Sequence, residues 1–199
     1  AGLKVSAAGS GLSIRGRSKG RTQYTVTLGP PLLDQFGQKL GHEEKFTVKV
    51  GSAQPTFVPP SQQFIVLDPK GPRQLTCQVI NYPKLKVRAW KVSYTDWDAY
   101  LKYLQTRGQN LKDHPVVPPG VQVIDTVVET HAKVDEDTEV PIDLSKALPG
   151  GHGHVVVRID PDPQEYPEDW RRQVYYGWVQ STDLGLDCVS DRQQLVAWV

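Results

Sequence analysis

Two apolar runs near the end of the chain, Trp178-Val-Gln-Ser-Thr-Asp-Leu-Gly-Leu186 and Leu195-Val-Ala-Trp-Val199, give the clearest indication of the fold. Both contain valine and tryptophan, which pack well on the pleated surface of a sheet. The polar segment from Asp187 to Gln194 joins them. We therefore expect a strand, a turn and a second strand here, and we expect the chain to be part of a longer protein.

Polar and apolar side chains alternate in the first fifty residues as well. Tyr24, Val26 and Leu28 alternate with polar neighbours, and the same spacing recurs from Lys45 to Val50. A period of two residues is typical of a strand with one buried face. Gly29-Pro-Pro31 between them supplies the backbone angles that a turn requires. These residues predict half-buried antiparallel strands.

A domain boundary is predicted near residue 52, where Gly51-Ser-Ala-Gln-Pro55 and Val58-Pro-Pro60 interrupt the alternation. Proline cannot donate to a central ladder, so such segments do not continue a sheet. Beyond it, Leu75 to Val79 and Leu85 to Val92 have strand composition again. Asn81-Tyr-Pro83 between them predicts a hairpin or two adjacent strands.

One segment changes to a helical period. Its apolar side chains recur at offsets of zero, three, four and seven residues, which line one face of a helix: Trp97, Tyr100, Leu101 and Leu104. Thr95 with Asp98 resembles a capping box, and Gly108 suits a left-handed C-terminal cap. We predict a helix over 96–107, with Trp97 and Tyr100 packed against a sheet rather than open for stacking on sugars.

Further strand-like runs lie at Val121 to Lys133, His154 to Ile159 and Val174 to Val179. Many short strands separated by turn signals, with one good helix, are typical of antiparallel sandwiches. The predicted fold class is all-β: antiparallel β-sandwich domains of immunoglobulin or fibronectin-III type, with one short inserted helix. The length of 199 residues suits one large domain or two small ones.

Composition argues against several classes of partner. The chain has 23 basic and 22 acidic residues, interspersed along its length, so no strong field attracts nucleic acid or an anionic membrane. The basic residues from Ser13 to Arg21 alternate as on a solvated strand face. All apolar runs are far shorter than the roughly 20 residues that span a bilayer. We expect no nucleic-acid partner and no transmembrane segment.

No residue pattern favours catalysis, so we expect no enzyme, no cofactor and no metal site. His152 and His154 alternate on a strand edge, but the glycines beside them suit a turn entering a strand. A cluster of acidic residues offers the oxygen ligands that calcium prefers, although the prolines between them indicate an exposed loop. These residues are Asp160, Asp162, Glu165, Glu168 and Asp169.

Two cysteines, Cys77 and Cys188, are too few for a structural zinc site. In an oxidising compartment they are a candidate disulfide, which would be worth roughly 4–5 kcal/mol by chain entropy. The alternative is two free thiols packed as small apolar side chains. The sequence leaves both open.

Several sequence segments, taken together with their order and spacing, resemble the N-terminal part of bacterial alpha-2-macroglobulins. The resemblance covers nearly the whole chain. The segments are Arg21-Thr-Gln-Tyr-Thr-Val-Thr-Leu28 with Asp34-Gln-Phe-Gly-Gln-Lys-Leu40, Val79-Ile-Asn-Tyr82, Asp143-Leu-Ser-Lys-Ala-Leu148 leading to Gly153-His-Val-Val-Val157, and the two runs after Trp178. The resemblance implies an immunoglobulin-like β segment over 1–52 and a macroglobulin-type sandwich over 53–181. It also implies that 182–199 opens a following sandwich.

That family traps proteases: cleavage of an exposed bait segment triggers collapse around the attacking enzyme, and many members carry an internal thioester. Its bacterial members are exported, often to the periplasm. The thioester motif of Cys, Gly, Glu and Gln in succession is absent here, because neither Cys77 nor Cys188 has that context. The resemblance therefore implies a non-catalytic scaffold segment of a broad-spectrum protease inhibitor. Its partners would be other domains of the same chain and, through the full-length protein, target proteases.

Two other functions fit the same strands. One is an extracellular adhesion or carbohydrate-binding sandwich module, because a sandwich fold alone does not determine function. The other is an accessory domain of an enzyme, which only the histidine and carboxylate groups suggest.

Overall fold

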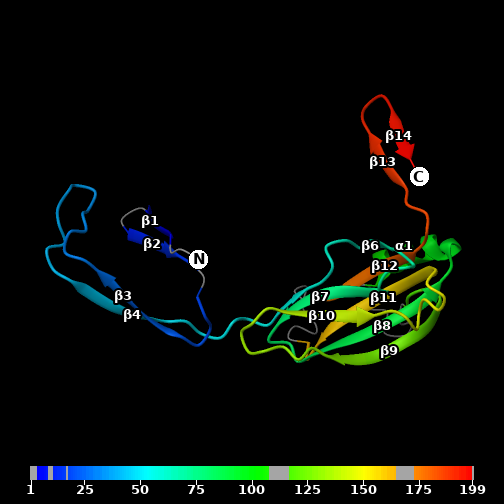
Figure 1. Cartoon of the computed structure of the whole chain (residues 1–199), viewed down its shortest axis with the longest axis horizontal. Helices are drawn as coiled ribbons and strands as arrows, with labels where there is room; N and C mark the ends of the chain where they lie inside the picture. Colours follow the sequence, from blue (N-terminus) through cyan, green and yellow to red (C-terminus); the bar gives the residue numbers. More distant parts are fainter. Residues whose placement is uncertain (1–3, 9–10, 17, 108–116, 165–172, 199) are drawn as a thin grey trace. The chain divides into compact units, whose positions relative to one another are not determined.

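The computed structural model describes residues 4–8, 11–16, 18–107, 117–164 and 173–198. Most regular structure in these residues is antiparallel strand, accompanied by a single α-helix and a short 3-10 helix, as Figure 1 shows. The predicted all-β class with one short helix is confirmed. The chain divides into two compact units, Ala1–Gln54 and Pro55–Val199.

The first unit contains two antiparallel, two-stranded ladders. The paired strands are β1 (Lys4–Ala8) with β2 (Gly11–Arg15), and β3 (Gln23–Leu28) with β4 (Glu44–Lys49). Asp34 organises the connection from β3 to β4, because its Oδ1 accepts the backbone N–H groups of Phe36 and Gln38, each at 2.8 Å. Such local bonds are the reason that aspartate favours turns.

The prediction of half-buried strands is wrong for β4. All its residues are exposed, and Phe46 and Val48 retain 43% and 42% of their accessible surface. The alternation does determine which face is apolar, because Tyr24 pairs with Val48 and Val26 pairs with Phe46. A two-stranded ladder has too little area to bury a face by itself. The sequence pattern therefore predicts the face correctly but not its burial.

The second unit is a β-sandwich with strand orders β10-β7-β5 and β6-β12-β11-β8-β9. Neighbouring strands are antiparallel, except that β6 runs parallel to β12. The strands are β5 (Thr56–Val58), β6 (Phe64–Leu67), β7 (Gln74–Ile80), β8 (Lys84–Val92), β9 (Val121–Glu129), β10 (Thr138–Asp143), β11 (Gly153–Asp162) and β12 (Tyr175–Ser181).

The main hydrophobic core lies between the two sheets. Val79 of β7 meets Val155, Val157 and Ile159 of β11 in this core, and all four are fully buried. Val156 belongs to a second buried cluster on the opposite face of β11 and is equally inaccessible. A strand covered on both faces is expected to be continuously apolar rather than alternating. This explains the uninterrupted valine run in β11.

β7 and β8 are not the predicted hairpin or adjacent pair. They belong to different sheets, so the chain crosses the sandwich between them. Asn81 in the connection has a φ of 57°, a left-handed conformation that asparagine tolerates. Its Nδ2 donates to Asp135 Oδ1 at 2.9 Å, and its Oδ1 accepts the backbone N–H of Asp135 at 2.8 Å. These bonds fix a corner between sheets, which the turn composition alone does not distinguish from a hairpin.

Helix α1 (Trp97–Thr106) packs on the face of the five-stranded sheet that is turned away from the smaller sheet. The strand register places three aromatic side chains and one valine side by side under it, which we call the aromatic row: Trp90, Val156, Trp178 and Phe64. The ring of Trp97 is edge-on to Trp178 and Phe64, at centroid distances of 5.1 and 5.7 Å. The helix therefore packs against the sheet mainly through aromatic rings.

The buried face of α1 differs slightly from the predicted one. Tyr100 and Tyr103 are 2% and 4% exposed, whereas Leu101 is 39% exposed. Tyr100 lies 5.4 Å from Trp178 between ring centroids, as expected for a helix-to-sheet contact. The proposed C-terminal cap, Gly108, lies outside the described residues.

The capping box lies two residues earlier than predicted. It belongs to a 3-10 turn, η1 (Tyr94–Asp96), that leads into α1. The Ser93 N–H donates to Asp96 Oδ2 at 2.8 Å, and Ser93 Oγ accepts the Thr95 N–H at 3.5 Å. The Thr95–Asp98 pairing is therefore wrong, because the 3-10 turn adds residues before the α-helix begins.

Replacing Asp96 with alanine is expected to lower the free energy of unfolding by about 1 kcal/mol, the usual effect of losing an N-terminal cap. The matched change Asp98→Ala should cost less than about 0.5 kcal/mol, because Asp98 only adds an acidic charge to the first turn. Urea unfolding followed by fluorescence measures both. A larger loss for Asp98→Ala would contradict the assigned cap.

The C-terminal run that starts at Leu195 does not pair with the run that starts at Trp178, contrary to what the sequence indicates. β13 (Asp187–Ser190) pairs with β14 (Leu195–Trp198), whereas β12 ends at Ser181. The residues from Asp187 that the sequence assigned to a turn therefore include a strand. The segment Thr182–Leu186 between β12 and β13, here called the exit segment, forms no strand.

Asp191 explains why the turn of this hairpin begins later. Its Oδ1 accepts the backbone N–H groups of Gln193 and Gln194 at 2.8 and 2.9 Å, and its own N–H donates to the Gln194 carbonyl at 3.0 Å. The polar stretch is therefore part strand and part turn, and hydrophobicity alone does not separate the two.

Candidate functional site

A partly buried ion pair lies on the face of the five-stranded sheet that carries α1. Arg158 and Asp160 of β11 alternate along the strand and so share a face. Arg158 Nε and Nη2 donate to the two carboxylate oxygens of Asp160 at 2.8 and 2.7 Å. Burial alone lowers the pKa of Arg158, but the hydrogen bonds and charge of Asp160 raise it above its usual value. The pair lies within a single strand and balances two opposite charges on the covered face of the sheet.

Asp160 is also the first member of the acidic group considered as a calcium site. Its carboxylate is engaged by Arg158 and its side chain is 7% exposed. Glu165, Glu168 and Asp169 lie outside the described residues.

His152 and His154 do not face a common site. The ring of His154 lies 5.7 Å from that of Trp178 between centroids, and burial lowers its pKa. His152 instead meets Asp183, 31 residues further along the chain. Among the residues that the structure describes, no group of three or more histidines, cysteines, aspartates or glutamates is arranged to hold a metal ion.

The two cysteines have different environments. Cys77 of β7 is 1% exposed in the main core, and burial raises the pKa of its thiol to about 12. Cys188 of β13 is exposed. The pairing of the two stays a prediction, which the intact mass with and without reductant tests.

In the reduced, folded protein, Cys188 is expected to react with iodoacetamide at pH 8 and Cys77 to stay protected. The thiolate is the reactive form, and a raised pKa together with burial suppresses it. Peptide mass mapping after alkylation identifies the modified residue. Equal modification of both cysteines before unfolding would contradict the buried position of Cys77.

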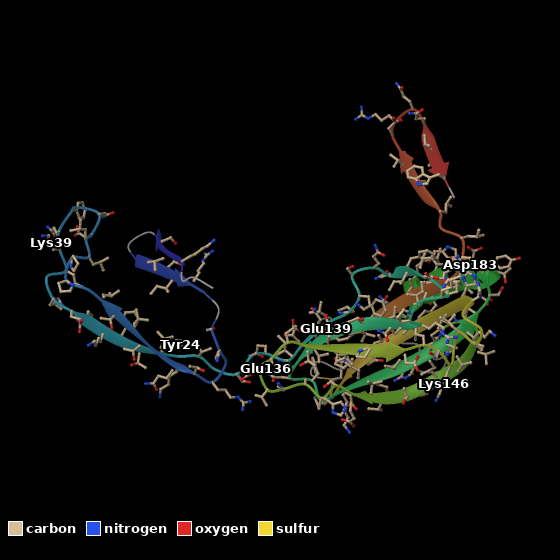
Figure 2. All side chains as sticks on the ribbon, viewed as in Figure 1. Tyr24, Lys39, Glu136, Glu139, Lys146 and Asp183 are labelled. Carbon is tan, nitrogen blue, oxygen red and sulfur yellow. The ribbon has the colours of Figure 1, made fainter. Side chains whose placement is uncertain are left out.

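Three segments that are distant in sequence meet where the chain leaves the sandwich. They are the loop after β6, the loop before β11 and the exit segment, which includes Asp183. Figure 2 shows Asp183 at this end of the sandwich and Glu136 at the other. The Thr182 N–H donates to the Leu67 carbonyl at 3.2 Å, and the Leu184 N–H donates to Thr182 Oγ1 at 3.1 Å. The beginning of the exit segment is therefore bonded to β6.

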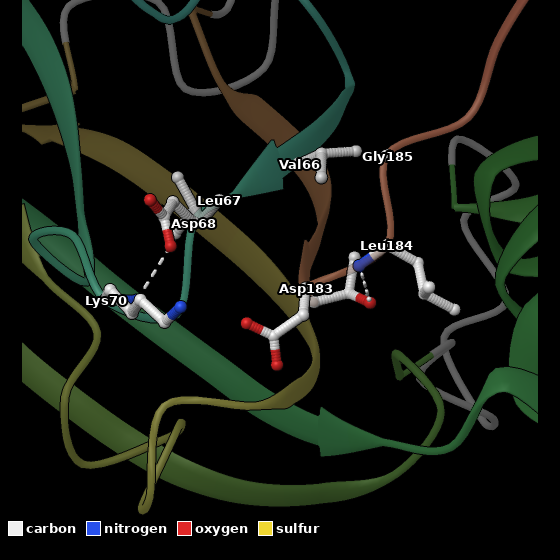
Figure 3. Close-up of a pocket in the computed structure, with 8 residues that line it drawn as sticks. Val66, Leu67, Asp68, Lys70, Asp183, Leu184 and Gly185 are labelled. Carbon is white, nitrogen blue, oxygen red and sulfur yellow. Dashed lines mark hydrogen bonds between the residues drawn. The ribbon is translucent and has the colours of Figure 1, made fainter. Parts of the chain in front are cut away.

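A pocket open to solvent lies between β6, its following loop and the exit segment. Figure 3 shows Val66 beside Gly185 and the carboxylate of Asp183 beside the cavity, with Lys70 also lining it. The Lys70 N–H donates to Asp68 Oδ1 at 2.8 Å. The residues that line this pocket are a mixture of aliphatic and charged ones, and they include no paired nucleophile and base.

The most sharply defined polar contact at this end is between His152 and Asp183. His152 Nε2 lies 2.6 Å from Asp183 Oδ2, and both side chains are more than half exposed. The hydrogen bond that His152 donates to Asp183, and then the one it donates to the Gly150 carbonyl, raise the pKa of His152. The bond from His152 correspondingly lowers the pKa of Asp183. Sequence reasoning missed this pair because nothing local connects residues 31 positions apart.

These features define the class of protein: an antiparallel β-sandwich with one helix on its outer face, in which the conspicuous polar groups stabilise sheets and corners. None of the helices in the described ranges is long and apolar enough to cross a membrane.

Comparison with known proteins relates the chain to a more specific group of proteins. No family model matches the chain. The chain is 26% identical over 168 residues to an alpha-2-macroglobulin homolog of Nostoc sp. (strain PCC 7120 / SAG 25.82 / UTEX 2576). This match includes 82% of the chain but only 8% of the length of that relative.

Two solved structures share the fold. The native alpha-2-macroglobulin of Escherichia coli, in a structure spanning domains MG0-NIE-MG1, matches 92% of this chain and 57% of that one, with a TM-score of 0.53 and 13% identity. The Y1175G mutant of Salmonella alpha-2-macroglobulin matches 89% of this chain and 10% of that one, with a TM-score of 0.52 and 14% identity. The predicted resemblance to bacterial alpha-2-macroglobulins is therefore confirmed.

Proposed function

We propose that this chain is a non-catalytic scaffold segment of an exported, broad-spectrum protease inhibitor of the alpha-2-macroglobulin type. The observation that carries the proposal is the sequence similarity to an alpha-2-macroglobulin homolog along 82% of the chain. The similarity in fold to bacterial alpha-2-macroglobulins supports it. The segment would act in the periplasm, in the cell envelope or outside the cell.

We also propose a division of the chain within that inhibitor. Residues 1–52 would be the later strands of an immunoglobulin-like domain, 53–181 a macroglobulin-type sandwich, and 182–199 the opening strands of a following sandwich. The exposed apolar face of β3 and β4 supports the first assignment, because a ladder with one apolar face is suited to packing in a larger sandwich. The partners of this segment would be other domains of the same chain.

The scaffold role agrees with how the sandwich uses its side chains. The five-stranded sheet packs against the smaller sheet on one face and against α1 on the other. A layer covered on both faces resists bending, because packed interiors deform little. Such a unit would transmit a rearrangement through its linkers and interfaces while keeping its own shape.

The contacts of Trp97 favour this role over a carbohydrate-binding module. The residue retains 36% of its accessible surface, and its ring meets Trp178 and Phe64 edge-on. It therefore contributes to helix packing, whereas a sugar platform requires an open ring face. Binding to a glycan array that Trp97→Ala abolishes, in a variant that still folds, would support the module instead.

Trapping of a protease is tested on the longer protein that contains this chain, purified from its source. After incubation with an excess of the inhibitor, a protease is assayed on a small peptide and on a large protein substrate. Entrapment should leave cleavage of the peptide nearly unchanged and suppress cleavage of the protein, because only the large substrate is excluded by size. The 199-residue chain alone serves as the control and should change neither activity. Equal loss of both activities, or of neither, would count against trapping.

A further inference from the structure

Both ring nitrogens of His152 face oxygen atoms that act as hydrogen-bond acceptors. Nε2 lies 2.6 Å from Asp183 Oδ2, and Nδ1 lies 3.4 Å from the Gly150 carbonyl oxygen. A neutral imidazole carries one N–H group, whereas the imidazolium carries two. Only protonated His152 can donate to both oxygens at once. The local geometry is therefore built for the charged form.

The His152–Asp183 pair joins the sandwich to the exit segment. His152 lies in the loop just before β11, and Asp183 is two residues beyond the end of β12. After Asp183 the exit segment is less enclosed: Leu184 and Leu186 are 70% and 71% exposed, and a Cβ added to Gly185 would meet no atom within 4 Å. The pair thus acts at the point where the chain separates from the sandwich.

We propose that His152 and Asp183 form a pH-dependent latch that sets how firmly the exit segment is held to the sandwich. In the closed latch, the imidazolium bonds to Asp183 and to the Gly150 carbonyl. Loss of the proton removes the charge attraction and leaves a single N–H to share between two acceptors. The exit segment beyond Thr182 is then held less firmly, and the hairpin of β13 and β14 that follows it gains freedom to move.

The other charged groups at this end modulate the latch without replacing it. Lys70, in the loop after β6, attracts Asp183 and helps to lower its pKa. Asp68 accepts the Lys70 backbone N–H and so orders that loop. The Thr182 N–H bond to the Leu67 carbonyl does not titrate and persists in both states. The latch therefore controls the segment that follows this fixed bond.

The sign of the pH dependence follows from the two pKa directions. The pKa of His152 is raised, so its contribution is lost as the pH rises through that raised value. The pKa of Asp183 is lowered, so its contribution is lost as the pH falls through that lowered value. The latch is closed between the lowered pKa of Asp183 and the raised pKa of His152, and it opens as the pH rises through the pKa of His152, which lies above its usual 6.5.

The test uses nuclear magnetic resonance of the chain between pH 5 and pH 8.5. The His152 ring signals give its titration, and hydrogen exchange of the Leu184 amide, which donates to Thr182 Oγ1, gives protection of the exit segment after correction for the intrinsic pH dependence. Protection is expected to fall about twofold to fivefold on opening, the range that an exposed ion pair supports. The midpoint of this fall should coincide with the titration of His152.

Two variants and one control make the outcome decisive. Asp183→Asn and His152→Gln should remove the pH dependence of exit-segment protection, and Asp183→Asn should also lower the pKa of His152. The matched control is His42→Gln, because His42 pairs with Glu44 at 3.4 Å in the first unit and its side chain is also more than half exposed to solvent. Unchanged protection of the core amides of β11 verifies folding in each case. Protection that is constant in the unmodified chain, or that keeps its midpoint in Asp183→Asn, would overturn the latch.

Discussion

Replacing Trp178 with alanine is expected to lower the free energy of unfolding by about 3–5 kcal/mol, the usual cost of removing a large buried aromatic side chain. Trp178 is 2% exposed and stands in the aromatic row beneath α1. Its ring contacts Trp97 and Tyr100, at centroid distances of 5.1 and 5.4 Å. The change therefore leaves a cavity and also removes the surface on which the helix packs.

Chemical denaturation of the chain measures this loss, and Trp198→Ala is its matched control. Trp198 of β14 is 50% exposed, so its removal should cost less than about 1 kcal/mol. Similar losses for the two variants would show that the aromatic row does not support the sandwich. A loss in Trp178→Ala confined to α1, with the sheets intact, would mean that the helix is an independent addition.

Replacing Arg158 with leucine is expected to lower the free energy of unfolding by about 3–5 kcal/mol, because it removes the guanidinium that donates two hydrogen bonds to the buried Asp160 carboxylate. The double variant Arg158→Leu with Asp160→Leu should recover most of this loss, since a buried ion pair is often no more stable than apolar side chains of similar volume. The same denaturation experiment compares the two. A double variant as unstable as the single one would contradict this explanation.

The pair of Lys45 with Glu43 shows why burial rather than distance decides the effect. Its shortest N–O distance is 2.7 Å, the same as for Arg158 and Asp160. The side chains of Lys45 and Glu43 are 61% and 53% exposed, however, against 19% and 7% in the buried pair. Water screens the exposed charges, so Lys45→Ala should cost less than about 1 kcal/mol.

Local periodicity predicted the parts of the fold that depend on local chemistry. The alternation in β3 gives its apolar face, and the apolar spacing around Tyr100 gives helix α1. Each follows from the repeat of a strand or a helix and needs no knowledge of distant residues. The fold class could therefore be inferred from the sequence.

Long-range pairing could not be inferred in the same way. The corner at Asn81 depends on hydrogen bonds to Asp135, 54 residues later, and it separates β7 and β8 into different sheets. The sequence did not predict β10. Its buried residues, Val140 and Ile142, flank Pro141, and the other residues of this strand are polar. An edge position tolerates this proline.

The candidate site illustrates the same limit. The sequence drew attention to His152 as a neighbour of His154, and the structure instead joins His152 to Asp183. The cysteine pairing depends on redox state, which the sequence does not reveal, and the proposed protease-trapping role rests on similarity to other proteins; both stay predictions. The sequence alone does show the resemblance to bacterial alpha-2-macroglobulins, through the order and spacing of several sequence segments.

The five-stranded sheet is covered on both faces, by the smaller sheet and by α1, and this double cover is the basis of the proposed rigid scaffold. Nuclear Overhauser contacts of the Trp178 ring test this directly. We expect contacts from Trp178 to the rings of Trp97 and Tyr100 in the helix. A folded α1 whose aromatic rings show no contact with Trp178 would contradict the claim.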